Sequence, residues 1–168
     1  MCDRILIVLD LDETMVHATL NELDRPEDFQ FEDYYVYVRP HLSTFIQKCN
    51  ELFDIAVWSN GGETYVTDIL KKIIPPSIEL RFVWPKSVFV NGIAQTLDTL
   101  RAPKNLRRLI ANGFEPSKVL IVDDNPDDSV SEFGNVIQFK PYRGEADECE
   151  LLLLSQYLEK VRFLKDTK

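Results

Sequence analysis

Residues 5–14 read Ile-Leu-Ile-Val-Leu-Asp-Leu-Asp-Glu-Thr, and the predicted architecture is built around this segment. The apolar run over 5–9 is rich in β-branched residues and contains no polar side chain. Such a run is typical of a strand that is buried on both faces, as the central strands of parallel sheets are. The carboxyl ends of central strands face the ligand crevice in open α/β sheets. We therefore expect Asp10 and Asp12, which follow the run, to lie where a substrate can reach them.

The two carboxylates after this run point to a bound cation. Two acids so close in space do not both stay ionised comfortably unless a positive charge lies between them. A ligand set made only of oxygen favours a hard ion, and we take that ion to be Mg²⁺. The same Asp-x-Asp-Glu-Thr residues also fit a polar turn with a helix cap, which would carry no chemistry. This segment alone leaves both interpretations open.

The composition is that of a globular domain. The chain has 168 residues, 45% of them hydrophobic, which is enough for one domain with a substantial core, spanning residues 1–168. Its net charge of -9 argues against a surface that coats nucleic acid, because phosphate backbones require a basic face. The three cysteines, Cys2, Cys49 and Cys149, form no zinc or disulfide pattern. With no secretory signal and no membrane-spanning stretch in the sequence, we expect an intracellular protein, cytoplasmic or nuclear.

Strand-like and helix-like segments alternate along most of the chain. Strands are predicted at 34–38, 53–58, 119–122 and 136–139, and helices from Pro40, over 63–73, from Pro103 and over 145–164. This alternation predicts an α/β fold with a Rossmann-like, mostly parallel sheet that helices cover on both faces.

Two segments interrupt the alternation. Residues 21–33 are polar and acidic, and we interpret them as an excursion over the surface. Residues 81–97 contain short β-like pieces around Asn91-Gly92, which is the strongest two-residue signal for a hairpin. We expect a small antiparallel β insertion there, too short to form a large cap domain. The crevice should therefore be open.

Polar clusters follow three of the predicted core strands. They are Asp10 with Asp12, Ser59 with Asn60, and Asp123 with Asp124. Because the ends of parallel strands lie along one edge of a sheet, these side chains should converge on one crevice. Lys104, near the start of the helix before the third of these strands, is expected to join them. Taken singly, each cluster also fits a capping turn, and Lys104 also fits a solvated surface lysine.

Together these residue types fit phosphoryl transfer. A transferred phosphoryl group needs its oxygens neutralised and its attacking and leaving atoms held in line. Mg²⁺ held by Asp10 and Asp124 would neutralise part of that charge, and Lys104 another part. Asp10 is suited to attack phosphorus and form an aspartyl-phosphate. Asp12 would protonate the leaving oxygen and then deprotonate water, while Ser59 would donate a hydrogen bond to the phosphate.

The motifs also carry a family resemblance. Residues 10–17, Asp-Leu-Asp-Glu-Thr-Met-Val-His, look like the first motif of the haloacid dehalogenase superfamily. They most resemble its branch of RNA polymerase II C-terminal-domain phosphatases and NLI-interacting-factor-like phosphatases. The likeness continues in order through residues 36–41, 53–59, 104–106 and 119–126.

The resemblance implies a role for each candidate residue. Asp10 would be the nucleophile, and Asp12 the acid and base as well as a metal ligand through its backbone carbonyl. The other implied roles are phosphate binding by Ser59 and Lys104, metal binding by Asp124, and an indirect or water-mediated contact with the metal by Asp123. Asn60, beside Ser59, is a further candidate for phosphate binding. Ser59 stands where threonine is common in the family, and Ser59-Asn60-Gly61 replaces the usual Thr-Ala-Ser, so substrate preference can differ.

Two other groups have both an ordinary and a functional interpretation. One is a basic cluster made of Arg101, Lys104, Arg107 and Arg108. It is either a solvated helix surface or a patch that attracts a phosphorylated, acidic substrate. The other is a set of aromatic residues, Tyr34, Tyr35, Tyr37 and Trp58. We expect these mainly in the core or at a sheet edge, with one or two as candidates to line a pocket for an apolar side chain such as proline.

We predict a Mg²⁺-dependent phosphatase that acts through an aspartyl-phosphate on phosphoserine or phosphothreonine in a flexible peptide, such as a polymerase C-terminal-domain-like tail. The nearest alternative is a nucleotide or small-metabolite phosphatase of the same superfamily. Other classes are a signalling receiver that stores a regulatory phospho-aspartate, and a catalytically silent binding module. The expected partner is a phosphorylated peptide or protein, without direct binding to nucleic acid or membrane, and the protein is expected to be a monomer or weak oligomer.

Overall fold

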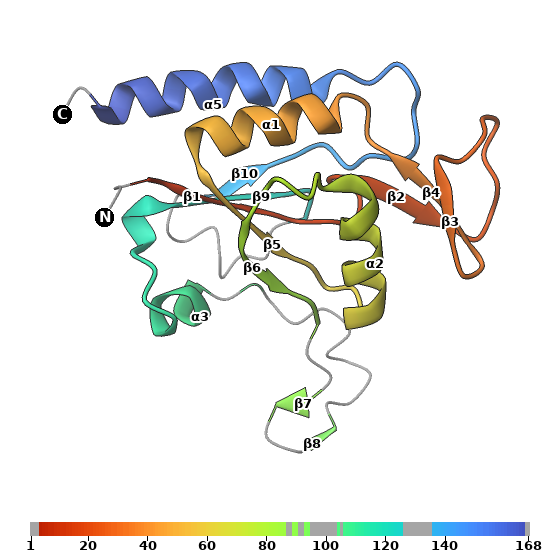
Figure 1. Ribbon diagram of the computed structural model, residues 1–168, viewed down its shortest axis with the longest axis horizontal. Helices are drawn as coiled ribbons and strands as arrows, with labels where there is room; N and C mark the ends of the chain where they lie inside the picture. Colours follow the sequence, from red (N-terminus) through yellow and green to blue (C-terminus); the bar gives the residue numbers. More distant parts are fainter. Residues whose placement is uncertain are drawn as a thin grey trace.

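A computed structural model describes residues 4–86, 89–90, 93–94, 104, 106–125 and 136–166. Its main sheet has five parallel strands in the order β10-β9-β1-β5-β6 (Figure 1). The strands are β1 (Leu6–Leu9), β5 (Asp54–Trp58), β6 (Leu80–Trp84), β9 (Val119–Asp123) and β10 (Val136–Gln138). The chain runs outward from β1 through β5 to β6 and then resumes on the other side of β1 with β9. The strand order therefore reverses beside β1, where open α/β sheets bind their ligands.

Strand β1 lies in the centre of the sheet in strict register with both neighbours. Leu9 is level with Val57 of β5 and with Val122 of β9. The backbone amide of Asp10 continues the pairing by donating to the carbonyl of Val122 over 3.0 Å. All four side chains of β1 are buried, as the apolar run predicted. The segments that follow β1, β5 and β9 consequently leave the sheet at the same level.

Helices cover both faces of the sheet, as expected. The helices are α1 (Leu42–Leu52), α2 (Glu63–Ile73), α3 (Leu106–Ala111) and α5 (Glu150–Asp166), and a 3₁₀ turn, η2, spans Pro116–Lys118. Side chains of α1, α2 and α5 share a core cluster with Ile7 and Leu9. Leu109 of α3 packs in a second cluster with Leu6 and Val8, which point to the other face. Figure 1 shows α1 and α5 together on one side of the sheet and α3 on the other.

A second, three-stranded antiparallel sheet lies between β1 and α1 in the chain. Its order is β2-β4-β3, with bounds Val16–Thr19, Tyr34–Val38 and Phe29–Phe31. Only β4 was predicted. The interpretation of residues 21–33 as a surface excursion was wrong in part, because β3 pairs with β4 at the end of that segment. Strands β2 and β3 have four and three residues, which is too short for a periodic pattern to stand out in the sequence.

The segment predicted as one antiparallel insertion divides into two parts. Strand β6 is the outer strand of the main sheet and runs parallel to β5, so this part of the prediction was wrong. The small antiparallel pair is formed by β7 (Phe89–Val90) and β8 (Ile93–Ala94). The expected turn residues Asn91 and Gly92 lie outside the described residues, as does Pro103, the expected start of the third helix. Side chains of β6 alternate between partly buried and exposed, as in an edge strand that packs on one face.

The last helix begins at residue 150 rather than at 145, and a buried ion pair explains the difference. Arg39 donates through Nε and Nη2 to the two carboxylate oxygens of Glu148, over 3.0 and 2.8 Å. Its guanidinium also donates to the carbonyls of Thr14 and Lys140. Glu148 is thus held outside the helix, and its Oε1 accepts the backbone N–H of Glu150 in the first turn. Within the described residues, every helix is too short or too polar to span a lipid bilayer.

We expect Arg39→Met to lower the free energy of unfolding by about 3 to 5 kcal/mol, because it leaves the buried Glu148 carboxylate without its positively charged partner. Urea denaturation followed by circular dichroism measures this loss. Lys71→Met is the matched control, since it removes one partner of an exposed ion pair with Asp68 and should change stability by less than about 0.5 kcal/mol. Equal effects of the two substitutions would contradict the importance of the buried pair.

Candidate active site

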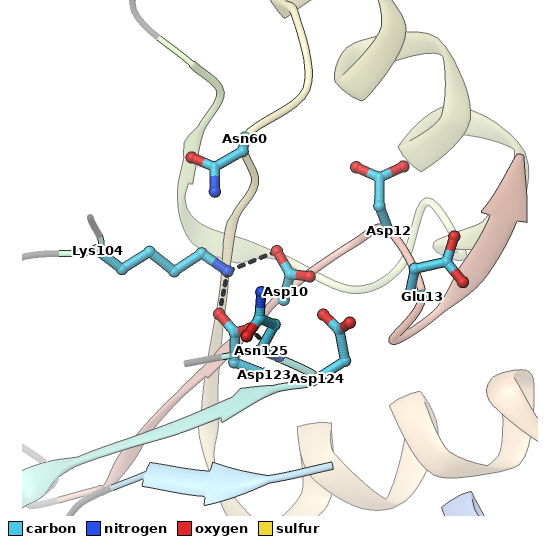
Figure 2. Close-up of a pocket in the computed structure, with 8 residues that line it drawn as sticks. All are labelled: Asp10, Asp12, Glu13, Asn60, Lys104, Asp123, Asp124 and Asn125. Carbon is cyan, nitrogen blue, oxygen red and sulfur yellow. Dashed lines mark hydrogen bonds and ion pairs between the residues drawn. The ribbon is translucent and has the colours of Figure 1, made fainter. Parts of the chain in front are cut away.

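A small pocket of about 110 Å³ opens where β1 and β9 end (Figure 2). Five acidic residues, one lysine and two asparagines line it: Asp10, Asp12, Glu13, Asp123, Asp124, Lys104, Asn60 and Asn125. They come from the segments after β1 and β5, from the last residue of β9 and the two residues that follow it, and from Lys104, two residues before α3 begins. The described lining therefore carries five carboxyl groups against one ammonium group. Such a pocket favours a bound cation.

Lys104 forms ion pairs with one acidic residue at the end of β1 and one at the end of β9. Its Nζ lies 2.5 Å from Oδ1 of Asp10 and 2.5 Å from Oδ2 of Asp123, and all three side chains are buried. Burial alone would lower the pKa of Lys104, but the charges of Asp10 and Asp123 outweigh that effect and raise it, so the amine stays protonated. Burial raises the pKa of Asp10 to about 7, against the opposing effect of Lys104. Asp10 therefore depends on nearby positive charge to stay ionised.

The residues present fit a divalent metal site. One carboxylate oxygen from each of Asp10, Asp123 and Asp124 lies within 4.8 Å of the other two. Ligand oxygens about 2.1 Å from Mg²⁺ are separated from one another by about 3 to 4 Å, so the spacing of these three oxygens is close to the spacing that one ion requires. Burial and the charge of Asp123 raise the pKa of Asp124. A cation bound between the three carboxylates would lower that pKa again.

Asp12 has a different environment from Asp10, although only one residue separates them. Its Oδ1 accepts a hydrogen bond from the phenol of Tyr65 over 2.5 Å, and its Oδ2 accepts one from Oγ of Ser59 over 3.3 Å. Burial raises the pKa of Asp12, while the hydrogen bonds from Tyr65 and Ser59 partly oppose the rise. Figure 2 shows the Asp12 carboxyl on the opposite side of the pocket from Lys104. The two aspartates are thus suited to different tasks.

Hydrogen bonds from buried residues fix the turn that follows Asp10 and Asp12 and leads into β2. Glu13 has a positive φ of 59°, which turns the chain back after Asp12. The carbonyl of Thr14 accepts a hydrogen bond from Arg39, and the carbonyl of Glu13 accepts one from the amide of Tyr142. The Glu13 carboxylate itself lies within hydrogen-bond distance of Nδ1 of His17 and forms an ion pair with Arg143. The backbone that carries Asp10 and Asp12 is therefore tied to the same buried arginine that holds Glu148.

The structure brings together six of the seven candidate residues in the lining of this pocket, and their roles in a reaction stay predictions. The exception is Ser59, which is buried and contacts Asp12 instead. Sequence reasoning missed Tyr65, whose hydroxyl reaches Asp12, because a tyrosine in the first turn of a helix carries no distinguishing pattern. It also left Glu13 and Asn125 unassigned, although both adjoin motif residues.

Of the described members of the predicted basic cluster, Lys104 alone lines the pocket. Lys104 is buried there, whereas Arg108 is exposed on α3 with its guanidinium 4.2 Å from the ring centre of Trp84. Arg101 lies outside the described residues. Among the aromatic candidates, Tyr37 and Trp58 are buried, and Tyr34 is exposed. The ordinary interpretation therefore holds for Tyr37 and Trp58.

A wider groove of about 450 Å³ adjoins the pocket and shares Asp12 and Asn60 with it. Phe31 and Tyr34 line it from the three-stranded sheet, and Tyr65 lines it from α2. Three aromatic rings, those of Phe31, Tyr34 and Tyr65, line it, in contrast to the acidic pocket beside it. A ligand larger than a phosphate group would have room to extend from the pocket into this groove.

Residues 5–168 match the NLI interacting factor-like phosphatase family. The chain is 27% identical over 173 residues to CTD small phosphatase-like protein 2 of Dictyostelium discoideum, covering 98% of this chain and 29% of that protein. It is 30% identical over 164 residues to CTD small phosphatase-like protein 3 of Caenorhabditis elegans, covering 92% of this chain and 53% of that protein. The chain thus spans between about a third and about half of the length of these relatives.

A solved structure with the same fold is that of the fission yeast RNA polymerase II CTD phosphatase bound to beryllium fluoride. It has a TM-score of 0.62 and 22% sequence identity, and the match covers 97% of this chain and 52% of that chain. The structural match shows that the two proteins share a fold. The family match extends over nearly the whole chain and includes every motif on which the resemblance was based. The chain therefore belongs to the NLI interacting factor-like phosphatase family.

Proposed function

We propose that this protein is a Mg²⁺-dependent phosphatase that hydrolyses phosphoserine or phosphothreonine in peptides through an aspartyl-phosphate on Asp10. One observation carries the proposal: the Asp10 carboxylate contacts Lys104 and lies beside the carboxylates of Asp123 and Asp124. This arrangement supports a nucleophile, a cation for the phosphate and a metal site in one pocket. The family to which the chain belongs supports the same chemistry.

The proposed reaction has two steps, and Asp12 takes part in both. A carboxylate oxygen of Asp10 bonds to phosphorus while the bond to the seryl or threonyl oxygen breaks, and Asp12 gives its proton to that oxygen. Asp12 then takes a proton from water as the water oxygen attacks phosphorus, which releases phosphate and restores the Asp10 carboxylate. The raised pKa of Asp12 supports this role, because its carboxyl must carry a proton in the first step.

Lys104 and the metal site would share the charge of the phosphoryl group. Asp10, Asp123 and Asp124 would hold Mg²⁺, together with the backbone carbonyl of Asp12 that the family resemblance implies. Bound Mg²⁺ supplies positive charge to the phosphoryl oxygens and keeps the carboxylates around it ionised. The protonated amine of Lys104 would donate to the phosphoryl oxygens from the other side of Asp10. Asn60, which lines the pocket, is the candidate for an additional donor.

A peptide substrate is supported by the groove beside the pocket. A phosphoserine side chain would reach the pocket while the flanking residues lie in the groove, against Phe31 and Tyr34. Relatives named CTD small phosphatase-like proteins point to phosphoprotein substrates as well. That the protein works as a single domain inside the cell, in the cytoplasm or nucleus, stays a prediction.

Asp10→Asn should abolish turnover, because an amide cannot form the phosphorylated intermediate. We expect kcat for a phosphoserine peptide to fall by about four orders of magnitude, equivalent to about 5 kcal/mol in the barrier. Wild-type protein quenched during turnover should carry one phosphoryl group on Asp10, detected by mass spectrometry. Asp68→Asn, which changes an exposed acid on α2, is the control and should leave kcat unchanged. Wild-type turnover by the Asp10 variant would exclude this nucleophile.

Removal of divalent cations should stop the reaction. Chelation with EDTA is expected to reduce phosphate release to background, and added Mg²⁺ should restore it, because the carboxylates of Asp10, Asp123 and Asp124 need a hard cation. Asp124→Asn should raise the Mg²⁺ concentration for half-maximal activity by at least about tenfold, since one charged ligand becomes neutral. Full activity in EDTA would contradict a metal-dependent mechanism.

The size of the groove predicts a preference for phosphopeptides over metabolites. In parallel assays of phosphate release, serine and threonine phosphopeptides should give kcat/KM at least about tenfold above those of nucleotides and sugar phosphates, because only peptides fill the groove as well as the pocket. Turnover of metabolites alone would favour the small-molecule alternative. A phospho-aspartate that persists without turnover would favour the receiver.

A further inference from the structure

We infer that Tyr65 is a positioning residue that holds the Asp12 carboxyl in the orientation needed for proton transfer. The inference rests on the acid and base role proposed for Asp12. The phenol hydroxyl of Tyr65 donates to Oδ1 of Asp12 over 2.5 Å, which is the shorter of the two side-chain hydrogen bonds that Asp12 accepts. Hydrogen bonds from fixed donors restrict the rotation of a carboxyl group, and proton transfer is sensitive to its orientation.

Tyr65 is itself held from two sides, so its hydroxyl has a defined position. It lies in the first turn of α2, which packs into the core through Val66 and Ile69. Its ring packs edge-on against Phe31 of β3, with the ring centres 5.3 Å apart at an interplanar angle of 78°. Tyr65 therefore connects the main domain core, the three-stranded sheet and Asp12. Among the described residues, the only other side chain hydrogen-bonded to Asp12 is that of Ser59.

The two glycines before α2, Gly61 and Gly62, explain how the ring of Tyr65 can lie next to Asp12. A Cβ atom on Gly61 would lie 2.8 Å from Cδ1 of Tyr65 and 3.1 Å from Oγ of Ser59. Both of those side chains donate to Asp12, so a side chain at Gly61 would displace the two donors together. A Cβ atom on Gly62 would have no neighbour within 4 Å. Gly61 is thus required for space around the Asp12 donors, whereas Gly62 is not.

Tyr65→Phe tests the inference, because it keeps the ring packed against Phe31 and removes only the hydroxyl. We expect kcat for a phosphoserine peptide to fall about 10- to 100-fold while KM stays within about twofold. Dinitrophenyl phosphate provides the decisive comparison, since its leaving group needs no proton. In a rapid-quench experiment, the rate at which Asp10 is phosphorylated by this substrate should change by less than about threefold.

Three results would overturn the inference. Unchanged kcat for the peptide would mean that the hydroxyl has no role in turnover. A raised KM with unchanged kcat would assign Tyr65 to substrate binding. An equal slowing of phosphorylation by the peptide and by dinitrophenyl phosphate would mean that Tyr65 does not act through the acid. Asp12→Asn tests the proposed function separately: wild-type kcat in that variant would refute the role of Asp12 whatever Tyr65→Phe does.

The two glycines supply a second, matched test. Gly61→Ala should lower kcat for the phosphopeptide by about tenfold or more, with the same dependence on the leaving group as Tyr65→Phe. Gly62→Ala should leave kcat within about twofold of the wild type. Thermal unfolding of each variant checks that the fold is retained. Equal kcat values for the Gly61 and Gly62 variants would contradict the requirement for space beside Tyr65.

Discussion

The parallel pairing of β1 with β5 on one side and β9 on the other is the constraint on which the site depends. Because Leu9 is level with Val57 and Val122, the residues that follow these strands emerge at the same edge of the sheet. Asp10 and Asp123 therefore lie close enough for one lysine to contact both. A register shift of a single residue would turn the core side chains of β1 to the wrong face and separate these carboxylates.

Charge is the second constraint, since the pocket gathers more acid than its one lysine can balance. Buried carboxylates are stable only with positive charge or hydrogen-bond donors nearby. The structure uses different partners for each acid: Lys104 for Asp10 and Asp123, and the hydroxyls of Tyr65 and Ser59 for Asp12. Asp10 thereby lies next to a fixed positive charge, whereas Asp12 has only neutral donors. Under the proposed function, this difference in partners would allow two neighbouring aspartates to serve as nucleophile and as proton carrier.

The parts of the fold that could be predicted were those with a long, regular pattern. The apolar run of β1 and the helical spacing of apolar residues after Pro40 predicted β1 and α1 closely, and the helix predicted over 63–73 has the bounds of α2. Strands β2 and β3 were missed because they are short and depend on pairing with β4. Strand β6 was assigned to the wrong sheet, since local alternation shows that a strand is half buried but does not identify its partner. The start of α5 depends on Arg39, more than a hundred residues away in the chain.

By itself the sequence determined the α/β class, the family and the acidic residues that follow the core strands, because apolar periodicity and residue type are local properties that folding does not alter. Only the tertiary structure decided which groups meet. It placed Lys104 between Asp10 and Asp123, turned the Ser59 hydroxyl toward Asp12 and brought Tyr65 to the same carboxyl. Those contacts join residues 19 to 94 positions apart, and such distances are set by strand register and helix packing rather than by any local pattern.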